Sequence, residues 1–324
     1  MADTLTTRTE VPIEVSQFYT RTLMDRAIPA LLHNRFAQVR DIPANAGTNV
    51  INFRKYGALT AQTTALTEGV TPSGKQLSTT DITATVLYYG DYVTITDKVL
   101  YETYDPILTE AAEVLGEQAG DSLDQLCRAV IAAGTTVQYA STATATNEVS
   151  AAMTLTRAEI KEAVRTLRGN NAKPITAMVD PSTGYNTTPI GRSFVGIISE
   201  DTLYDLDDAT GWIPVEKYPN KSNVMEDEVG SCGNVRFIMS TNAGISPAGG
   251  VAGNDVHYTL IFGQNAYAQT RISGHAMQNI VKPLGSAGTA DPLNQRTTSG
   301  WKAAYVAKIL EQGFIVRIEH GVSA

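Results

Sequence analysis

Apolar positions along the chain change between strand-like and helix-like spacing without a regular alternation of the two. Residues 50–53 and 82–86 alternate apolar and polar side chains, and residues 92–96 continue the pattern, as half-buried strands do. Between them lies a polar stretch, residues 59–79, punctuated by Thr, Gly and Pro and poor in large apolar groups. Because this stretch cannot bury much surface by itself, we expect it to project from its domain and pack against another surface.

Two helices have clear boundary signals. Residues 106–133 carry apolar side chains at helical spacing, with Asp105 as N-cap and Pro106 in the first turn, which predicts a helix roughly 42 Å long. A second helix begins at a capping box formed by Thr156 and Glu159, and Gly169 follows its end.

Shorter segments complete an α+β mixture. Residues 1–15 are Thr-rich and without helical period, which predicts an extended arm, and residues 16–39 have a helical pattern interrupted at Pro29. Further short elements are predicted at 194–198, 201–206, 235–239 and 256–262. Two strand-like runs, 301–310 and 314–319, close the chain and predict a hairpin around residues 311–313.

Composition and charge narrow the class of protein. The 324 residues are 43% hydrophobic, enough for one large domain or two moderate ones. The net charge is −8, and no basic stripe of the kind that binds the phosphates of nucleic acid is visible. No run approaches eighteen apolar residues, and the N-terminus lacks the pattern of a secretory signal. Cys127 and Cys232 are expected to be reduced thiols in a cytosol.

Candidate chemistry is sparse. Gly69–Lys75 has the spacing of a phosphate-binding loop, but Gln76 replaces the hydroxyl that would hold magnesium, and a strand rather than a helix follows. The four histidines, His33, His257, His275 and His320, show no metal-ligand spacing, and no nucleophile motif occurs. The acidic groups at 205–208 and 226–228 are interpreted as solvated turns. We therefore predict no catalytic, cofactor-binding or metal-binding residue, and no enzyme activity.

Several sequence blocks carry a family resemblance. They are LTEGVTPSG at 66–74, YGDYV at 89–93, LGEQAG at 115–120, NNAKP at 170–174, and GSAGTADPLNQR at 285–296 with GWK at 300–302. With these blocks the chain resembles the major capsid protein of tailed bacteriophages, which has the Hong Kong 97-type fold, and more narrowly the coat proteins of N4-like podophages. The resemblance implies an α+β fold with an N-terminal arm, an extended loop, a peripheral domain with a spine helix, and an axial domain.

By this resemblance, residues 1–47 form the arm and its helix, 48–97 the extended loop hairpin, 98–139 with 286–324 the peripheral domain, and 140–285 the axial domain. Residues 106–133 would be the spine helix. The implied function is self-assembly into pentamers and hexamers of an icosahedral shell that encloses double-stranded DNA. The residues expected to contact other subunits are Thr4, Leu5, Arg8, Val11, Glu68, Pro72, Lys75, Asp291, Arg296 and Trp301.

The implied partners are further copies of the chain, a separate scaffold protein and a portal, with decoration proteins left open. Packaged DNA would meet the inner face non-specifically, and no cofactor or membrane is expected. The implied location is the virion capsid, assembled in the bacterial cytoplasm, and no maturation cleavage is expected. Two alternatives stay open: the shell of an encapsulin-like compartment, which shares the fold, and an α+β enzyme with an unrecognised site.

Overall fold

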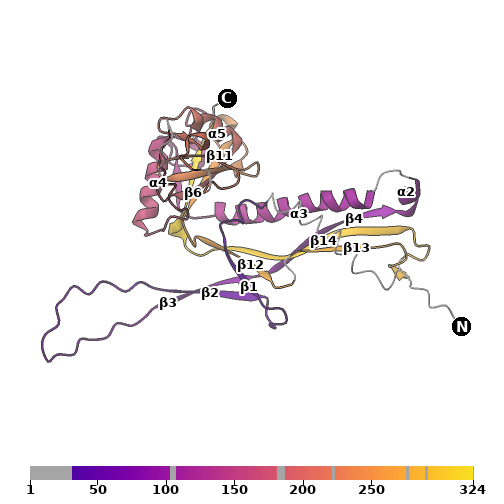
Figure 1. Ribbon diagram of the computed structural model, residues 1–324, viewed down its shortest axis with the longest axis horizontal. Helices are drawn as coiled ribbons and strands as arrows, with labels where there is room; N and C mark the ends of the chain where they lie inside the picture. Colours follow the sequence, from indigo (N-terminus) through magenta and orange to yellow (C-terminus); the bar gives the residue numbers. More distant parts are fainter. Residues whose placement is uncertain are drawn as a thin grey trace.

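The computed structural model describes residues 31–102, 107–180, 187–220, 223–274, 277–288 and 291–323. Figure 1 shows a long helix lying along extended strands, a more compact unit at one end of them, and a narrow loop that projects away from both. The predicted α+β class is confirmed.

A five-stranded sheet forms the extended part. Its strands are β1 (Gln38–Ile42), β4 (Leu87–Thr96), β12 (Tyr267–Ile272), β13 (Gln278–Lys282) and β14 (Arg296–Ile309). The fourteen-residue β14 pairs antiparallel with β12, β13 and β4, and β1 pairs parallel with β12. The short helix α2 (Asp97–Glu102) follows β4.

Helix α3 (Ile107–Ala132) packs on one face of this sheet through residues such as Leu115 and Ala119, which share a core with Trp301. Its far end reaches the compact unit, because Arg128 donates to the Asn242 carbonyl at 2.7 Å. The helix predicted at 106–133 is therefore confirmed over residues 107–132, whereas its predicted cap, Asp105 and Pro106, lies outside the described residues. The helix connects the two parts of the chain.

The compact unit is built on an eight-stranded sheet. Its strands are β5 (Val137–Tyr139), β6 (Phe194–Ile198), β7 (Ile213–Pro214), β8 (Glu228–Cys232), β9 (Val235–Met239), β10 (Ile245–Ser246), β11 (Val256–Phe262) and β15 (Ile315–His320). Helices α4 (Arg157–Gly169) and α5 (Glu200–Asp207) contribute Ile160, Leu167 and Leu206 to a core shared with this sheet. Short 3-10 turns lie at Thr146–Glu148, Val215–Lys217, Val251–Gly253 and Gln312–Phe314.

The capping box at the start of α4 is confirmed. The Thr156 backbone N–H donates to the Glu159 carboxylate at 2.6 Å, and the Thr156 hydroxyl donates to the same oxygen at 3.0 Å. The second carboxylate oxygen accepts from the Ser141 N–H at 2.7 Å, so Glu159 also fixes the preceding loop. Leu155 and Ile160, which flank the capping box in the sequence, are both buried.

The hairpin predicted at the end of the chain is wrong. β14 and β15 are both strands, but β14 lies in the five-stranded sheet and β15 pairs with β11 and β5 in the eight-stranded one. The 3-10 turn at Gln312–Phe314 carries the chain from one sheet to the other. The expected domain boundaries also differ from the sheets: β12 and β13 fall within 140–285 but belong to the five-stranded sheet.

The helix predicted at 16–39 is wrong where the structure describes it. Residues 16–30 lie outside the described ranges, residues 32–36 form turns, and Val39 lies in β1. The backbone of His33 bonds to distant groups instead: its N–H donates to Asp124 at 2.7 Å and its carbonyl accepts from the Tyr267 hydroxyl at 2.6 Å. These tertiary partners replace the hydrogen bonds that a helix would supply.

Candidate assembly surfaces

The projecting loop is carried by a hairpin of its own. β2 (Val50–Tyr56) and β3 (Thr79–Thr85) pair antiparallel from Val50 opposite Thr85 to Tyr56 opposite Thr79. At the base, Ile51 packs against a small core of Ile42, Val86 and Ala304, which joins the hairpin to the five-stranded sheet. The predicted excursion from a strand-flanked base is confirmed.

Ion pairs stiffen the base of this hairpin. Arg54 and Asp81 face each other across the two strands, with Nε to Oδ1 at 2.8 Å and Nη2 to Oδ2 at 3.1 Å. The hydrogen bonds from Arg54 lower the pKa of the Asp81 carboxyl. Lys55 forms an ion pair with Glu311, just after β14. The Arg54 pair therefore joins the two strands of the hairpin, whereas Lys55, together with Ile51, connects the hairpin to the rest of the chain.

Beyond the hairpin, every residue from 58 to 78 is exposed. The side chain of Leu66 is 74% exposed and that of Val70 is 62% exposed, although both are apolar. Each half of the loop, residues 57–67 and 68–78, extends at most about 40 Å. A loop of this composition has too little core to stabilise itself, so its apolar side chains are available to a second surface.

The predicted contact residues Glu68, Pro72 and Lys75 all lie in this exposed loop. Glu68 and Gly69 form the turn at its tip, where Gly69 has a φ of +75° that suits glycine. Lys75 spans the loop, because its ammonium donates to the Thr60 carbonyl at 2.7 Å and to the Thr60 hydroxyl at 3.2 Å. The tip is therefore formed by Glu68 and its neighbours, whereas Lys75 also holds the two limbs together.

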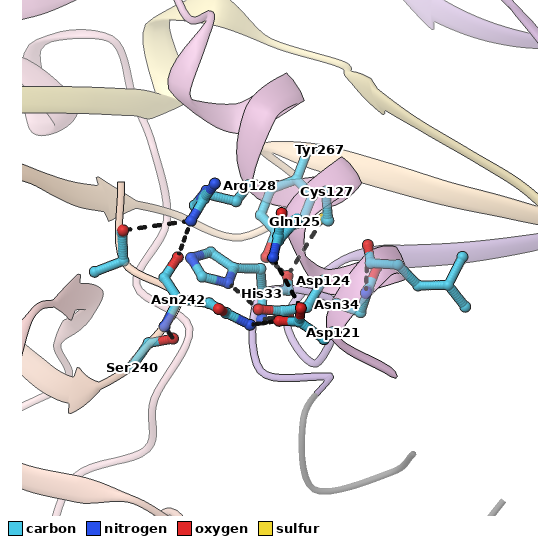
Figure 2. A network of polar contacts seen from close by, with 12 residues as sticks. His33, Asn34, Asp121, Asp124, Gln125, Cys127, Arg128, Ser240, Asn242 and Tyr267 are labelled. Atoms are coloured by element: carbon cyan, nitrogen blue, oxygen red, sulfur yellow. Dashed lines mark hydrogen bonds and ion pairs between the residues drawn. The ribbon is translucent and has the colours of Figure 1, made fainter. Parts of the chain in front are cut away.

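The arm residues Thr4, Leu5, Arg8 and Val11 lie outside the described residues. Where the described chain begins, His33 fixes its course: its Nδ1 lies 2.7 Å from Asp124 Oδ2, and both side chains are fully buried (Figure 2). The Cys127 thiol lies 3.6 Å from the His33 carbonyl. This network attaches the first described residues of the chain to α3.

A groove of about 610 Å³ runs over the five-stranded sheet. Along β4 the side chains alternate: Tyr89 packs on the core with α3, whereas Tyr88 and Tyr92 are exposed on the other face. Tyr92 lies over Gly300, where a Cβ would come within 2.6 Å of the tyrosine Cβ. A glycine is needed at this position for the ring to lie against the sheet.

The three predicted contact residues near this groove differ in exposure. Arg296 is exposed and lines the groove. Asp291 is buried and accepts the Arg296 backbone N–H at 2.8 Å, and Trp301 is buried and donates to Gln118 of α3 at 3.2 Å. Asp291 and Trp301 thus contribute to the packing of their own chain. Of the three residues, Arg296 is the exposed one that can contact another subunit.

The compact unit contains one side-chain arrangement that sequence reasoning missed. Ser199 Oγ lies 2.9 Å from His257 Nδ1, and His257 Nε2 lies 3.9 Å from Asp201. The same serine oxygen caps α5 by accepting the Thr202 N–H at 3.3 Å, and Ser199 is buried. Its oxygen is therefore occupied by the helix cap, and the arrangement stabilises the start of α5 rather than exposing a nucleophile.

The thiols are also unsuited to nucleophilic chemistry. Burial raises the pKa of Cys127 to about 12, and burial raises that of Cys232 as well. In the part of the chain that the structure describes, no three His, Cys, Asp or Glu side chains gather as a metal site. Over the same residues, no helix is long and apolar enough to cross a membrane.

Comparisons with known proteins show which fold this is. No family profile matches the sequence, and no curated protein matches it. Among solved structures, the capsid of Ralstonia phage GP4 is similar with a TM-score of 0.70 at 13% identity, over 90% of this chain and 88% of that one. The capsid of cyanophage Pam1 has a TM-score of 0.65 at 16% identity, over 93% of both chains.

A third similar structure is a virus-like particle from Pyrococcus furiosus, with a TM-score of 0.52 at 12% identity, over 94% of this chain and 99% of that one. At such identities the likeness shows the fold, and it covers nearly the whole chain. The chain has the fold of phage capsid proteins, as the sequence resemblance implied. The narrower resemblance to N4-like coat proteins stays a prediction.

Proposed function

We propose that this chain is the major capsid protein of a tailed phage, which assembles as pentamers and hexamers into an icosahedral shell around double-stranded DNA. The observation that carries the proposal is the projecting loop. A capsid-like fold with an exposed, partly apolar loop, carried by its hairpin, has a surface that a neighbouring copy can complete.

In this proposal the five-stranded sheet with α3 is the peripheral domain and the eight-stranded sheet with α4 and α5 is the axial domain. The loop at 57–78 crosses to the adjacent subunit of the same capsomer. Extended loops and arms add contact area without a single rigid fit, which suits a subunit that meets both five-fold and six-fold neighbours.

We also propose which partners the chain meets during assembly. A separate scaffold protein and a portal would act during assembly in the host cytoplasm, and packaged DNA would meet the inner face without sequence preference. The chain acts as a structural protein and not as an enzyme, which is consistent with its occupied Ser199 and buried thiols.

Deletion of the loop tip, residues 68–75, tests the role of the loop. The tip makes no contribution to either core, so the shortened subunit should stay soluble and folded but assemble poorly. Deletion of residues 1–15 should have the same effect if the arm contacts neighbours. Sedimentation separates shells from subunits, and circular dichroism checks the fold. Normal shells from both deletions would refute these roles.

A compartment shell that encloses protein cargo is the second candidate, because one of the similar structures is a virus-like particle from Pyrococcus furiosus and not a phage capsid. The higher TM-scores to the two phage capsids favour the genome-enclosing shell. Nuclease treatment of particles from infected cells separates the two, because a phage capsid protects genomic DNA and a compartment shell protects a protein cargo.

A further inference from the structure

The outer face of α4 carries four cations. Arg157, Lys161, Arg165 and Arg168 follow one another at spacings of three and four residues, which places them on one face of the helix, and all four are exposed. Within the described ranges, none of these four side chains forms an ion pair. On a chain with a net charge of −8, such a face is a local positive surface, which corrects the expectation that the chain carries no basic stripe.

These cations line a groove of about 540 Å³ between α4, β7 and the turn that joins β8 to β9. Its other walls include Ile190, Ile213 and Ser231, and no described acidic side chain lines it. Burial raises the pKa of the Cys232 thiol in the wall, and Arg157 and Lys161 act in the opposite direction, as a positive potential does.

Helix α5 presents the opposite charge. Glu200, Asp207 and Asp208 are exposed around a shallow hollow of about 490 Å³, with Tyr204, 75% exposed, and Trp212 beside them. No described basic side chain lines this hollow, and none of the three carboxylates is in an ion pair within the described residues. The face therefore combines uncompensated negative charge with an apolar centre.

The α4 groove and the α5 face lie at different places on the compact unit. In Figure 1, α4 lies on the flank of the compact unit that is on the same side as the projecting loop, and α5 lies farther from that flank. A subunit that reaches its neighbour through the loop therefore turns α4 toward the same neighbour. In a head-to-tail ring, the neighbour meets this flank with a different part of its own surface.

We propose that the α4 groove of one copy binds the α5 face of the next copy around each capsomer. This inference rests on the proposed shell function and names the contact that aligns the compact units. Apolar side chains beside the charges, Ile213 on one face and Tyr204 on the other, fit a protein partner better than a phosphate backbone. Complementary charges fix the register of the two copies and reject misaligned ones.

Charge reversal tests the pairing. Arg165→Glu with Arg168→Glu reverses the α4 face, and Asp207→Lys with Asp208→Lys reverses the α5 face. All four side chains are exposed, and cations at the end of α5 suit its helix dipole, so the fold should persist. Each double variant should raise the subunit concentration needed for assembly at least about tenfold, and the quadruple variant should recover it.

Lys173→Glu with Lys217→Glu is the matched control. It changes the net charge by the same amount and in the same direction as the α4 variant, at exposed residues of the same unit outside the groove, and should assemble like the wild type. If wild type and control form no shells, the proposed function fails, but the pairing is still measured in solution. An equimolar mixture of the two double variants should associate in analytical ultracentrifugation, whereas each alone should not.

Three results would overturn the pairing. They are normal assembly of both double variants, loss of assembly that the quadruple variant does not recover, and a mixture that stays unassociated. Tight binding of a duplex oligonucleotide by wild-type subunits, abolished in the α4 variant, together with failed recovery, would assign the groove to nucleic acid instead.

Discussion

At the scale of single residues, His320 shows how burial fixes a charge state. It is fully buried in β15, with Nδ1 2.8 Å from the Gly321 carbonyl and Nε2 2.9 Å from the Thr259 hydroxyl. Nδ1 donates to the Gly321 carbonyl, which can only accept, and in the neutral ring Nε2 then accepts from the Thr259 hydroxyl. Burial lowers the pKa of His320 from 6.5 to about 4.

This lowered pKa predicts an acid-sensitive subunit. Between pH 6.5 and about 4 the unfolded chain binds a proton at residue 320 that the folded chain excludes, so the free energy of unfolding falls as the pH is lowered. The loss should reach about 3 kcal/mol near pH 4. Urea denaturation of unassembled subunits across this range measures it.

His320→Gln is the informative variant, because its side chain keeps a hydrogen-bonding group near Thr259 but does not titrate. Its unfolding free energy should depend less on pH than that of the wild type. Part of the slope should persist, because burial also lowers the pKa of His257, whose ring centroid is 6.3 Å away. Equal slopes in the two proteins would show that His320 does not control the acid response.

At the scale of elements, the start of α4 depends on one carboxylate. Glu159 accepts from the Thr156 N–H, the Thr156 hydroxyl and the Ser141 N–H while it is largely buried. Glu159→Ala should therefore lower the free energy of unfolding by about 2 kcal/mol.

Glu162→Ala, one turn along the same helix at an exposed residue, is the control and should change stability by less than about 0.5 kcal/mol. Urea denaturation of both variants gives the comparison. Equal stability of the two would mean that α4 does not need its capping box.

Elements with local signals could be predicted from sequence. The strands at 194–198, 235–239 and 256–262 coincide with β6, β9 and β11, and Thr156 marks the start of α4. Pairing partners could not be predicted in this way. β15 joins β11 across more than fifty residues of sequence, and the course of residues 31–37 depends on His33 bonding to Asp124.

The residues of the assembly surfaces also differ in whether the sequence could predict them. The exposed tip at Glu68 could be predicted because a polar, Thr-rich loop has no core of its own. The burial of Asp291 and Trp301 could not, because it requires β14 to lie beneath α3, which no local pattern shows. The cations of α4 have a local signal, because they recur at helical spacing after the capping box. The position of the acidic α5 face relative to them could not be predicted, because it depends on how both helices pack on one sheet.

At the scale of the whole molecule, the chain leaves surfaces that a second copy can cover. The loop at 57–78, the tyrosine face of β4, and the α4 and α5 faces all lie outside the two main cores. Together they distribute contacts over the length of the subunit. In a shell, the arrangement of neighbours differs slightly from one subunit to the next, so we expect many modest interfaces of this kind.

Electron microscopy of the purified chain, over a range of concentration and ionic strength, is the decisive measurement of whether this protein forms a shell. We expect closed shells of uniform diameter with rings of five and six subunits. Particles that remain monomers or dimers under every condition, with size exclusion in agreement, would contradict this expectation.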